Sequence, residues 1–171
     1  CPSLCRHCIR RRLLVTDADE VEAKPGNIKG LLEYLRNHEE VRDVLVTGGD
    51  AFSYSNEKLD GLLEKLYSIP HVEMVRLGTR YPVTLPYRVD EELLSVLSKY
   101  DPLYVMIQVN HPREITPEFE TVCRKLAEAG VVLGNQAVLL KGVNDKADLQ
   151  KEMNELLLKN RVWPYYLYQC D

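Results

Sequence analysis

The stretch Asp43-Val-Leu-Val-Thr-Gly-Gly-Asp50 carries the pattern that decides the fold. The run from Asp43 to Thr47 is mostly apolar and rich in β-branched side chains. Because it is too short for a helix, it predicts a buried β-strand. Gly48-Gly49-Asp50 ends this strand abruptly. A helix is predicted next, because four leucines recur at helical spacing up to Pro70: Leu59, Leu62, Leu63 and Leu66.

The same strand-then-helix unit recurs about every thirty residues along the chain. Further strands are predicted at 72–78, 103–109, 131–138 and 163–169, the fourth strand being interrupted by Gly134. Further helices are predicted at 28–38, 91–99, 116–129 and 146–158, with a proline-rich turn at 81–86. Thr116-Pro117 is a good helix start, and Gly130 a good helix end. Such alternation requires parallel strands joined by right-handed crossovers.

An open doubly wound sheet and a β/α barrel both fit this alternation. The barrel is favoured by the positions of the polar residues, because the strand C-terminal ends of a barrel face one common mouth. These residues sit at or near predicted strand ends: Asp50, Thr79, Arg80, Asn110, His111, Gln136 and Asp171. The sequence therefore predicts an α/β fold, a partial parallel barrel with about five βα units in one domain spanning 1–171.

Three cysteines open the chain in the order Cys-x3-Cys-x2-Cys, at Cys1, Cys5 and Cys8. Thiolates are soft ligands that suit zinc or an iron–sulfur cluster. A closed zinc site needs four ligands, and His7 could supply the fourth only by distorting a very short loop. A cubane cluster has four irons, so three thiolates would leave one iron for a small-molecule ligand. We therefore predict a 4Fe–4S cluster on these cysteines, with zinc as the alternative.

The bulk composition narrows the class of protein. The chain has 171 residues, enough for one domain with a substantial core. Its net charge of −4 argues against a nucleic-acid binder, although Arg10-Arg11-Arg12 is a local basic spot. No apolar run reaches the roughly 18 residues of a membrane span. The free thiols favour a reducing compartment, so a cytoplasmic location is predicted, and Cys123 is predicted to be a buried small apolar residue.

The cysteine motif, with His7 before its last cysteine, resembles the radical S-adenosylmethionine (SAM) superfamily. The resemblance implies that the cysteines hold a 4Fe–4S cluster whose open iron chelates SAM, and that His7 lies near the adenine. The segment Val46-Thr-Gly-Gly-Asp-Ala51 is similar to the methionine-binding motif, which implies SAM-binding roles for Gly48, Gly49 and Asp50. Asn135 and Gln136 occupy the strand where superfamily members contact SAM, with barrel-lining packing as their alternative role.

Several further blocks resemble the lysine 2,3-aminomutase family in particular, in family order: Cys5–Arg12, Val75–Arg80, Asn110–Thr116, Leu133–Leu140, Gly142–Asp145 and Tyr165–Asp171. The resemblance implies an isomerase that interconverts L-α-lysine and L-β-lysine through a 5′-deoxyadenosyl radical. It implies pyridoxal 5′-phosphate (PLP) as a further cofactor and flavodoxin or ferredoxin as the electron donor. It admits a homo-oligomer and gives no reason for a nucleic-acid or membrane partner.

Two charged residues match substrate-binding positions of that family. Arg10 matches the arginine that binds the α-carboxylate, and Asp171 matches a carboxylate that binds the remote ammonium of lysine. The alternatives are a solvated arginine in a basic run and a surface aspartate.

No catalytic residue is expected within this segment. The family's PLP-binding lysine is expected downstream, and Lys141 occupies a different position. We therefore interpret the chain as a segment of a longer one, without its N-terminal region and its PLP-lysine region. Gln108 stands where a histidine is typical of the lysine enzymes. Alternatives are accordingly a radical SAM aminomutase acting on glutamate, arginine or protein-bound lysine, or a non-catalytic zinc-binding module.

Overall fold

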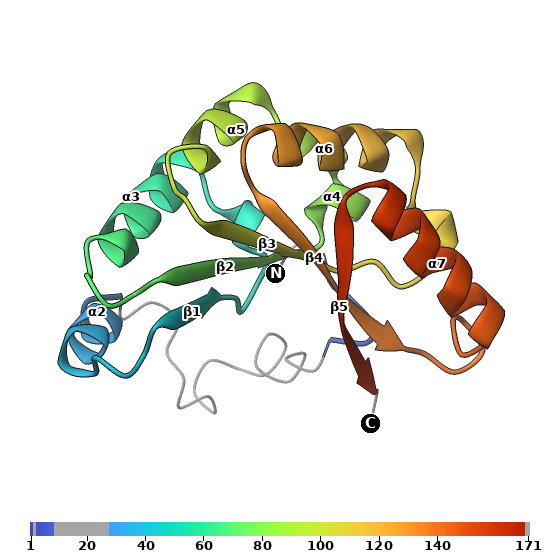
Figure 1. Cartoon of the computed structure of the whole chain (residues 1–171), viewed down its shortest axis with the longest axis horizontal. Coiled ribbons are helices and arrows are strands. Elements are labelled where there is room, and N and C mark those ends of the chain that lie inside the picture. Colours follow the sequence, from blue (N-terminus) through green and yellow to red (C-terminus); the bar gives the residue numbers. More distant parts are fainter. Residues whose placement is uncertain (2, 9–27, 170–171) are drawn as a thin grey trace.

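The computed structural model describes residues 1, 3–8 and 28–169, and it contains a five-stranded parallel sheet (Figure 1). The strands follow the chain order β1-β2-β3-β4-β5, and every neighbouring pair is parallel. Their bounds are β1 Asp43–Val46, β2 Met74–Thr79, β3 Leu103–Ile107, β4 Val132–Leu139 and β5 Val162–Gln169. The predicted α/β fold is confirmed. The sheet stays open in the described residues, as a partial barrel does.

Helices alternate with the strands along the chain. They cover one side of the sheet, as Figure 1 shows for α3, α5, α6 and α7. The helical bounds are α2 Ile28–Asn37, α3 Asn56–Tyr67, α4 Tyr81–Thr84, α5 Glu91–Leu97, α6 Pro117–Glu128 and α7 Ala147–Lys159. Side-chain oxygens cap α3, α5 and α6, from Ser55, Asp90 and Thr116 respectively. Within the described ranges, no helix combines the length and the apolar character that crossing a membrane requires.

The core lies between the sheet and these helices. Side chains alternate along β2, so Val75 and Leu77 are fully buried while Arg76 between them is half-buried. Each large apolar side chain buried in this way contributes about 1.5–3 kcal/mol to folding. Of the four leucines whose periodicity predicted α3, Leu59, Leu63 and Leu66 are fully buried and Leu62 is partly buried against the core. The other helices also bury large apolar side chains in this core: Leu93, Leu97, Phe119 and Leu126.

Two local predictions were wrong. The fourth strand is not interrupted at Gly134, because pairing with β3 continues through this residue to Asn135. A Cβ at Gly134 would lie only 2.7 Å from the Met106 methyl carbon, so the glycine makes room for Met106. The irregularity of β4 falls between Asn135 and Gln136. The predicted turn at 81–86 contains the short helix α4, since proline is accepted in a first helical turn.

Candidate functional site

Asp50 joins three segments of the chain just past the C-terminal end of β1. The residue is only 5% exposed, and both oxygens of its carboxylate accept hydrogen bonds. Oδ1 accepts from the Thr79 hydroxyl at 2.6 Å and from the Phe52 backbone N–H at 3.0 Å. Oδ2 accepts from the Arg80 backbone N–H at 2.7 Å and from the Ser3 hydroxyl at 3.5 Å. The Asp50 side chain therefore ties the end of β2 and the cysteine segment to the end of β1.

The glycine pair before Asp50 lies against the first cysteine. Gly48 has φ +137°, a backbone conformation that favours glycine. A Cβ built on Gly49 would lie 3.6 Å from Cys1 Cβ and 3.9 Å from Cys1 Sγ. Two motifs almost fifty residues apart in sequence are thus neighbours in space. Their predicted roles toward a cluster and SAM stay predictions.

The three cysteines of the motif are free thiols. Cys1 is exposed, whereas Cys5 and Cys8 are partly exposed, and the Cys8 N–H donates to the Cys5 carbonyl at 3.1 Å. In the part of the chain that the structure describes, no three His, Cys, Asp or Glu side chains converge as ligands of a single metal ion would. A cubane cluster sets a different requirement, because each cysteine binds a separate iron. Soft, reachable thiols on one short loop fit that requirement.

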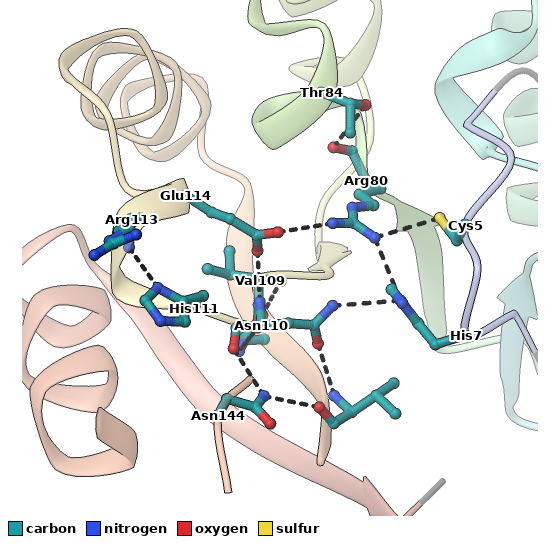
Figure 2. A network of polar contacts seen from close by, with 12 residues as sticks. Cys5, His7, Arg80, Thr84, Val109, Asn110, His111, Arg113, Glu114 and Asn144 are labelled. Atoms are coloured by element: carbon teal, nitrogen blue, oxygen red, sulfur yellow. Dashed lines mark hydrogen bonds and ion pairs between the residues drawn. The ribbon is translucent and has the colours of Figure 1, made fainter. Parts of the chain in front are cut away.

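Arg80 extends from the end of β2 toward this loop (Figure 2). Its Nη1 lies 3.5 Å from Cys5 Sγ and 3.3 Å from His7 Nε2, and its Nη2 donates to Glu114 Oε1 at 2.7 Å. The Arg80 Nε is buried and has no hydrogen-bond partner among the described residues. The sequence placed Arg80 at the barrel mouth but assigned it no role. Its position directly after a strand was the available signal.

Three asparagines hold the ends of β3 and β4 together. Asn135 pairs its side-chain amide with the Val109 backbone, accepting at 2.8 Å and donating at 3.0 Å. Asn110 Oδ1 accepts from the Val138 N–H at 2.8 Å. Asn144 donates to the carbonyls of Asn110 and Val138 at 2.7 and 2.8 Å. These amides continue the strand pairing beyond the end of β3. Sequence reasoning missed this, because an asparagine does not reveal a distant backbone partner.

The surroundings of His7 define its protonation state. Asn110 Oδ1 is occupied by a backbone N–H, so the Asn110 amide turns its Nδ2 toward His7 Nε2, at 3.3 Å. Arg80 Nη1 also faces this ring nitrogen, and both groups are donors only. These two donors favour the neutral imidazole that carries its proton on Nδ1 and accepts at Nε2. Burial and the nearby Arg80 guanidinium lower the pKa of His7, which agrees with this assignment.

A pocket of about 680 Å³ opens beside His7 at the ends of β4 and β5. Its volume lies within the usual range for small-molecule sites. The pocket is lined by apolar, basic and acidic side chains. The lining residues are Arg6, His7, Leu139, Leu140, Lys141, Val143, Asp145 and Gln169.

The other predicted site residues lie either at this rim of the sheet or outside the described residues. Gln136 is partly exposed at the irregular point of β4, next to Asn135. His111 accepts a hydrogen bond from the Arg113 N–H at 3.1 Å, which is a turn-forming contact. Arg10 and Asp171 lie outside the described residues. The structure thus brings the cysteine loop, the glycine pair and His7 to one rim of the sheet.

Comparisons with known proteins match this chain over nearly its whole length. The family model described as "Radical SAM superfamily" matches residues 1–153. An L-lysine 2,3-aminomutase of Clostridium subterminale is 49% identical over 171 residues, covering 100% of this chain and 41% of the relative. A glutamate 2,3-aminomutase of Clostridioides difficile is 48% identical over 169 residues, covering 99% of this chain and 40% of the relative. The chain thus spans about two fifths of the length of these relatives.

The crystal structure of Streptococcus suis SuiB bound to S-adenosylmethionine has the same fold. The two superpose with a TM-score of 0.65 at 14% sequence identity, over 90% of this chain and 36% of that chain. At this identity the likeness supports the fold alone.

Proposed function

Because this chain belongs to the radical SAM superfamily, we propose that it forms the core of a PLP-dependent L-lysine 2,3-aminomutase, an isomerase of L-α-lysine and L-β-lysine. The observation that carries the proposal is the 49% identity to such an enzyme along all 171 residues. The contact of the cysteine loop with the strand-end glycines supports it, because it assembles the two motifs that cluster and SAM would need at one place.

We assign the 4Fe–4S cluster to Cys1, Cys5 and Cys8. Their thiols are free and reachable, and the loop that carries them lies at the strand ends. Cluster and SAM together would supply a 5′-deoxyadenosyl radical that removes a hydrogen atom from the substrate. The role of this chain is to hold the cysteine loop in place and to leave one coordination position open, since it offers three local thiolates.

We assign the methionyl part of SAM to the backbone of Gly48 and Gly49, and the adenosine part to the pocket beside His7. Asp50 serves this site through its neighbours, because its carboxylate is occupied by donors from the protein itself. In the same way Asn135 fixes the rim of the sheet. Gln136 is partly exposed at that rim, and we assign it a contact with SAM.

The substrate assignment rests on the sequence. Arg10 would bind the α-carboxylate of the amino acid, and Asp171 its remote ammonium, each through a charge-assisted hydrogen bond. PLP is proposed by resemblance alone, since no residue of this chain matches the lysine that binds it in the family. A flavodoxin or ferredoxin as electron donor and a cytoplasmic location complete the proposal.

A glutamate aminomutase is the second candidate, because the glutamate enzyme is 48% identical to this chain, almost the same value as the lysine enzyme. Sequence identity therefore does not tell whether lysine or glutamate is the substrate. Asp171 does separate them, since an anion at the remote end of the substrate suits an ammonium and repels a carboxylate.

The test is anaerobic reconstitution of the full-length protein with iron, sulfide, SAM, PLP and a reductant, followed by incubation with lysine, glutamate, arginine or alanine. We expect β-lysine as the main product and broad absorbance near about 400 nm from thiolate-bound iron. The Cys5→Ala variant is the control, which should lack both. Conversion of glutamate instead of lysine would show that glutamate is the substrate. A colourless protein that contains zinc would contradict the assignment of a cluster and of aminomutase activity.

A further inference from the structure

Arg80 is held rigidly on two sides. Its backbone N–H donates to Asp50 Oδ2 at 2.7 Å, which fixes the residue at the end of β2. Its Nη2 donates to Glu114 Oε1 at 2.7 Å, while Glu114 Oε2 accepts from the Asn110 N–H at 2.7 Å. The Glu114 carboxylate is therefore fixed to the end of β3 as well. With its side chain only 17% exposed, the guanidinium has a defined position.

The remaining edge of the guanidinium faces the cysteine loop. Nη1 lies 3.5 Å from Cys5 Sγ, within the range of an N–H···S hydrogen bond, and 3.3 Å from His7 Nε2 (Figure 2). The Arg80 Nε adds a buried donor without a partner in the described part of the chain. An arginine in this place offers the loop both a positive charge and directed N–H groups.

We propose that Arg80 is a positioning residue for the cluster, which orients the cysteine loop through Cys5 and His7 and makes the cluster easier to reduce. This inference rests on the proposed function, since it assumes a 4Fe–4S cluster on Cys5. The physical reason is electrostatic. The reduced cluster carries one more negative charge than the oxidised cluster, so a fixed cation and N–H···S bonds stabilise the reduced state more strongly.

The chain provides a matched control in a second arginine, Arg76. Arg76 is the third residue of β2 and pairs with Asp43, the first residue of β1, through bonds of 3.0 and 2.6 Å, and its side chain is 22% exposed. Arg76→Met and Arg80→Met each remove one arginine from an ion pair with a carboxylate, the first within β2 and the second just past its end. Of these two arginines, only Arg80 has a contact with the described residues of the cysteine loop. Arg80→Lys keeps the charge but cannot reach Cys5, His7 and Glu114 together.

The first measurement is a redox titration of the reconstituted full-length protein, followed by electron paramagnetic resonance of the reduced cluster. We expect a lower reduction potential in Arg80→Met, an unchanged potential in Arg76→Met and an intermediate value in Arg80→Lys. An unchanged potential in Arg80→Met overturns the proposal even if the loop has loosened, because Arg80 would then have a merely structural role. Should Arg80→Met not fold, an unchanged potential in Arg80→Lys overturns it.

The second measurement uses the metal-free protein, so it does not depend on the proposed function. We expect amide hydrogen exchange at residues 3–8 to be roughly tenfold faster in Arg80→Met, because charge-assisted bonds to the loop are lost. Arg76→Met should leave this exchange unchanged. Equal exchange in the two variants overturns the positioning role. If the wild-type protein takes up zinc and no iron, the proposed function fails, and this comparison alone decides on the positioning role.

Discussion

The helix-facing side of the sheet and the rim formed by the strand ends are built from the same strands but held together differently. On the helix-facing side, Val75 and Leu77 pack into an apolar core that excludes water. At the rim, buried side chains such as Asp50, Asn110 and Asn144 each bond particular backbone groups of a neighbouring strand or loop.

The difference lies in how specific each contact is. An apolar core requires volume and shape, so a substitution that conserves both is tolerated. In a buried polar rim each donor must face an acceptor. Replacing a donor by an acceptor of equal size, or the reverse, therefore leaves a buried group without a hydrogen bond. The rim should therefore be sensitive to substitutions that the core would accept. It is also the place where the predicted chemistry lies, and the following predictions test this contrast.

The largest effect is expected at the cysteine loop. Cys5→Ala should abolish the iron cluster, because each of the three thiolates is needed to hold it. The fold should persist, since Cys5 is only partly buried. Iron content and absorbance measure the first effect, and circular dichroism the second. Retention of a full complement of iron in this variant would remove Cys5 from the ligand set.

The next effect compares two nearly isosteric substitutions. Asn144→Asp puts an acceptor against the carbonyls of Asn110 and Val138, at a residue that is 1% exposed. We expect a loss of about 4 kcal/mol in the free energy of unfolding. Leu93→Met, in the fully buried core, should cost less than about 1.5 kcal/mol. Urea unfolding of both variants measures the difference, and equal losses would contradict the contrast between core and rim.

A smaller effect is expected at Asp50. Asp50→Asn replaces one acceptor oxygen by an amide that faces protein donors, so we expect a loss of about 2 kcal/mol in the free energy of unfolding. Asp90→Asn is the control, because Asp90 accepts one bond as the N-cap of α5 and asparagine is also a good N-cap. This control should lose less than about 1 kcal/mol. If Asp90→Asn lost more free energy of unfolding than Asp50→Asn, Asp50 would not be the residue that holds the rim together.

The smallest effect concerns Cys123, a fully buried thiol on α6. Burial raises the pKa of Cys123 to about 12 from its ordinary value of 9.0. Its contribution to stability is therefore intact below pH 9.0 and is lost progressively as the pH rises toward about 12, because only the unfolded chain releases the proton. At pH 8 iodoacetamide should modify Cys123 in urea but not in the folded protein, as mass spectrometry of its peptide can show. Equally fast modification in both would contradict this burial.

Much of the fold could be predicted because its causes are local. Hydrophobic periodicity located the strands and helices, and Thr116-Pro117 and Gly130 marked the ends of α6, where the structure has a capping Thr116 and a Gly130 at φ +85°. The motifs also led to the superfamily that the family model matches. One error had a local cause, because proline, taken as a turn signal at 81–86, is accepted in the first turn of α4. The other arose where a local signal was outweighed by a distant contact. Gly134 is a strand residue because Met106 packs against it.

The amino-acid order by itself determined the parallel β/α architecture and the candidate ligands, since strand length, helical spacing and the cysteine motif are properties of short segments. Only the tertiary structure decided which candidate side chains are already engaged. The Asp50 carboxylate and the Asn135 amide are bound by other strands, whereas Arg80 reaches Cys5 across 75 positions of sequence. The reason is that a hydrogen bond depends on distance and direction in space, and only folding sets these for residues far apart in the chain.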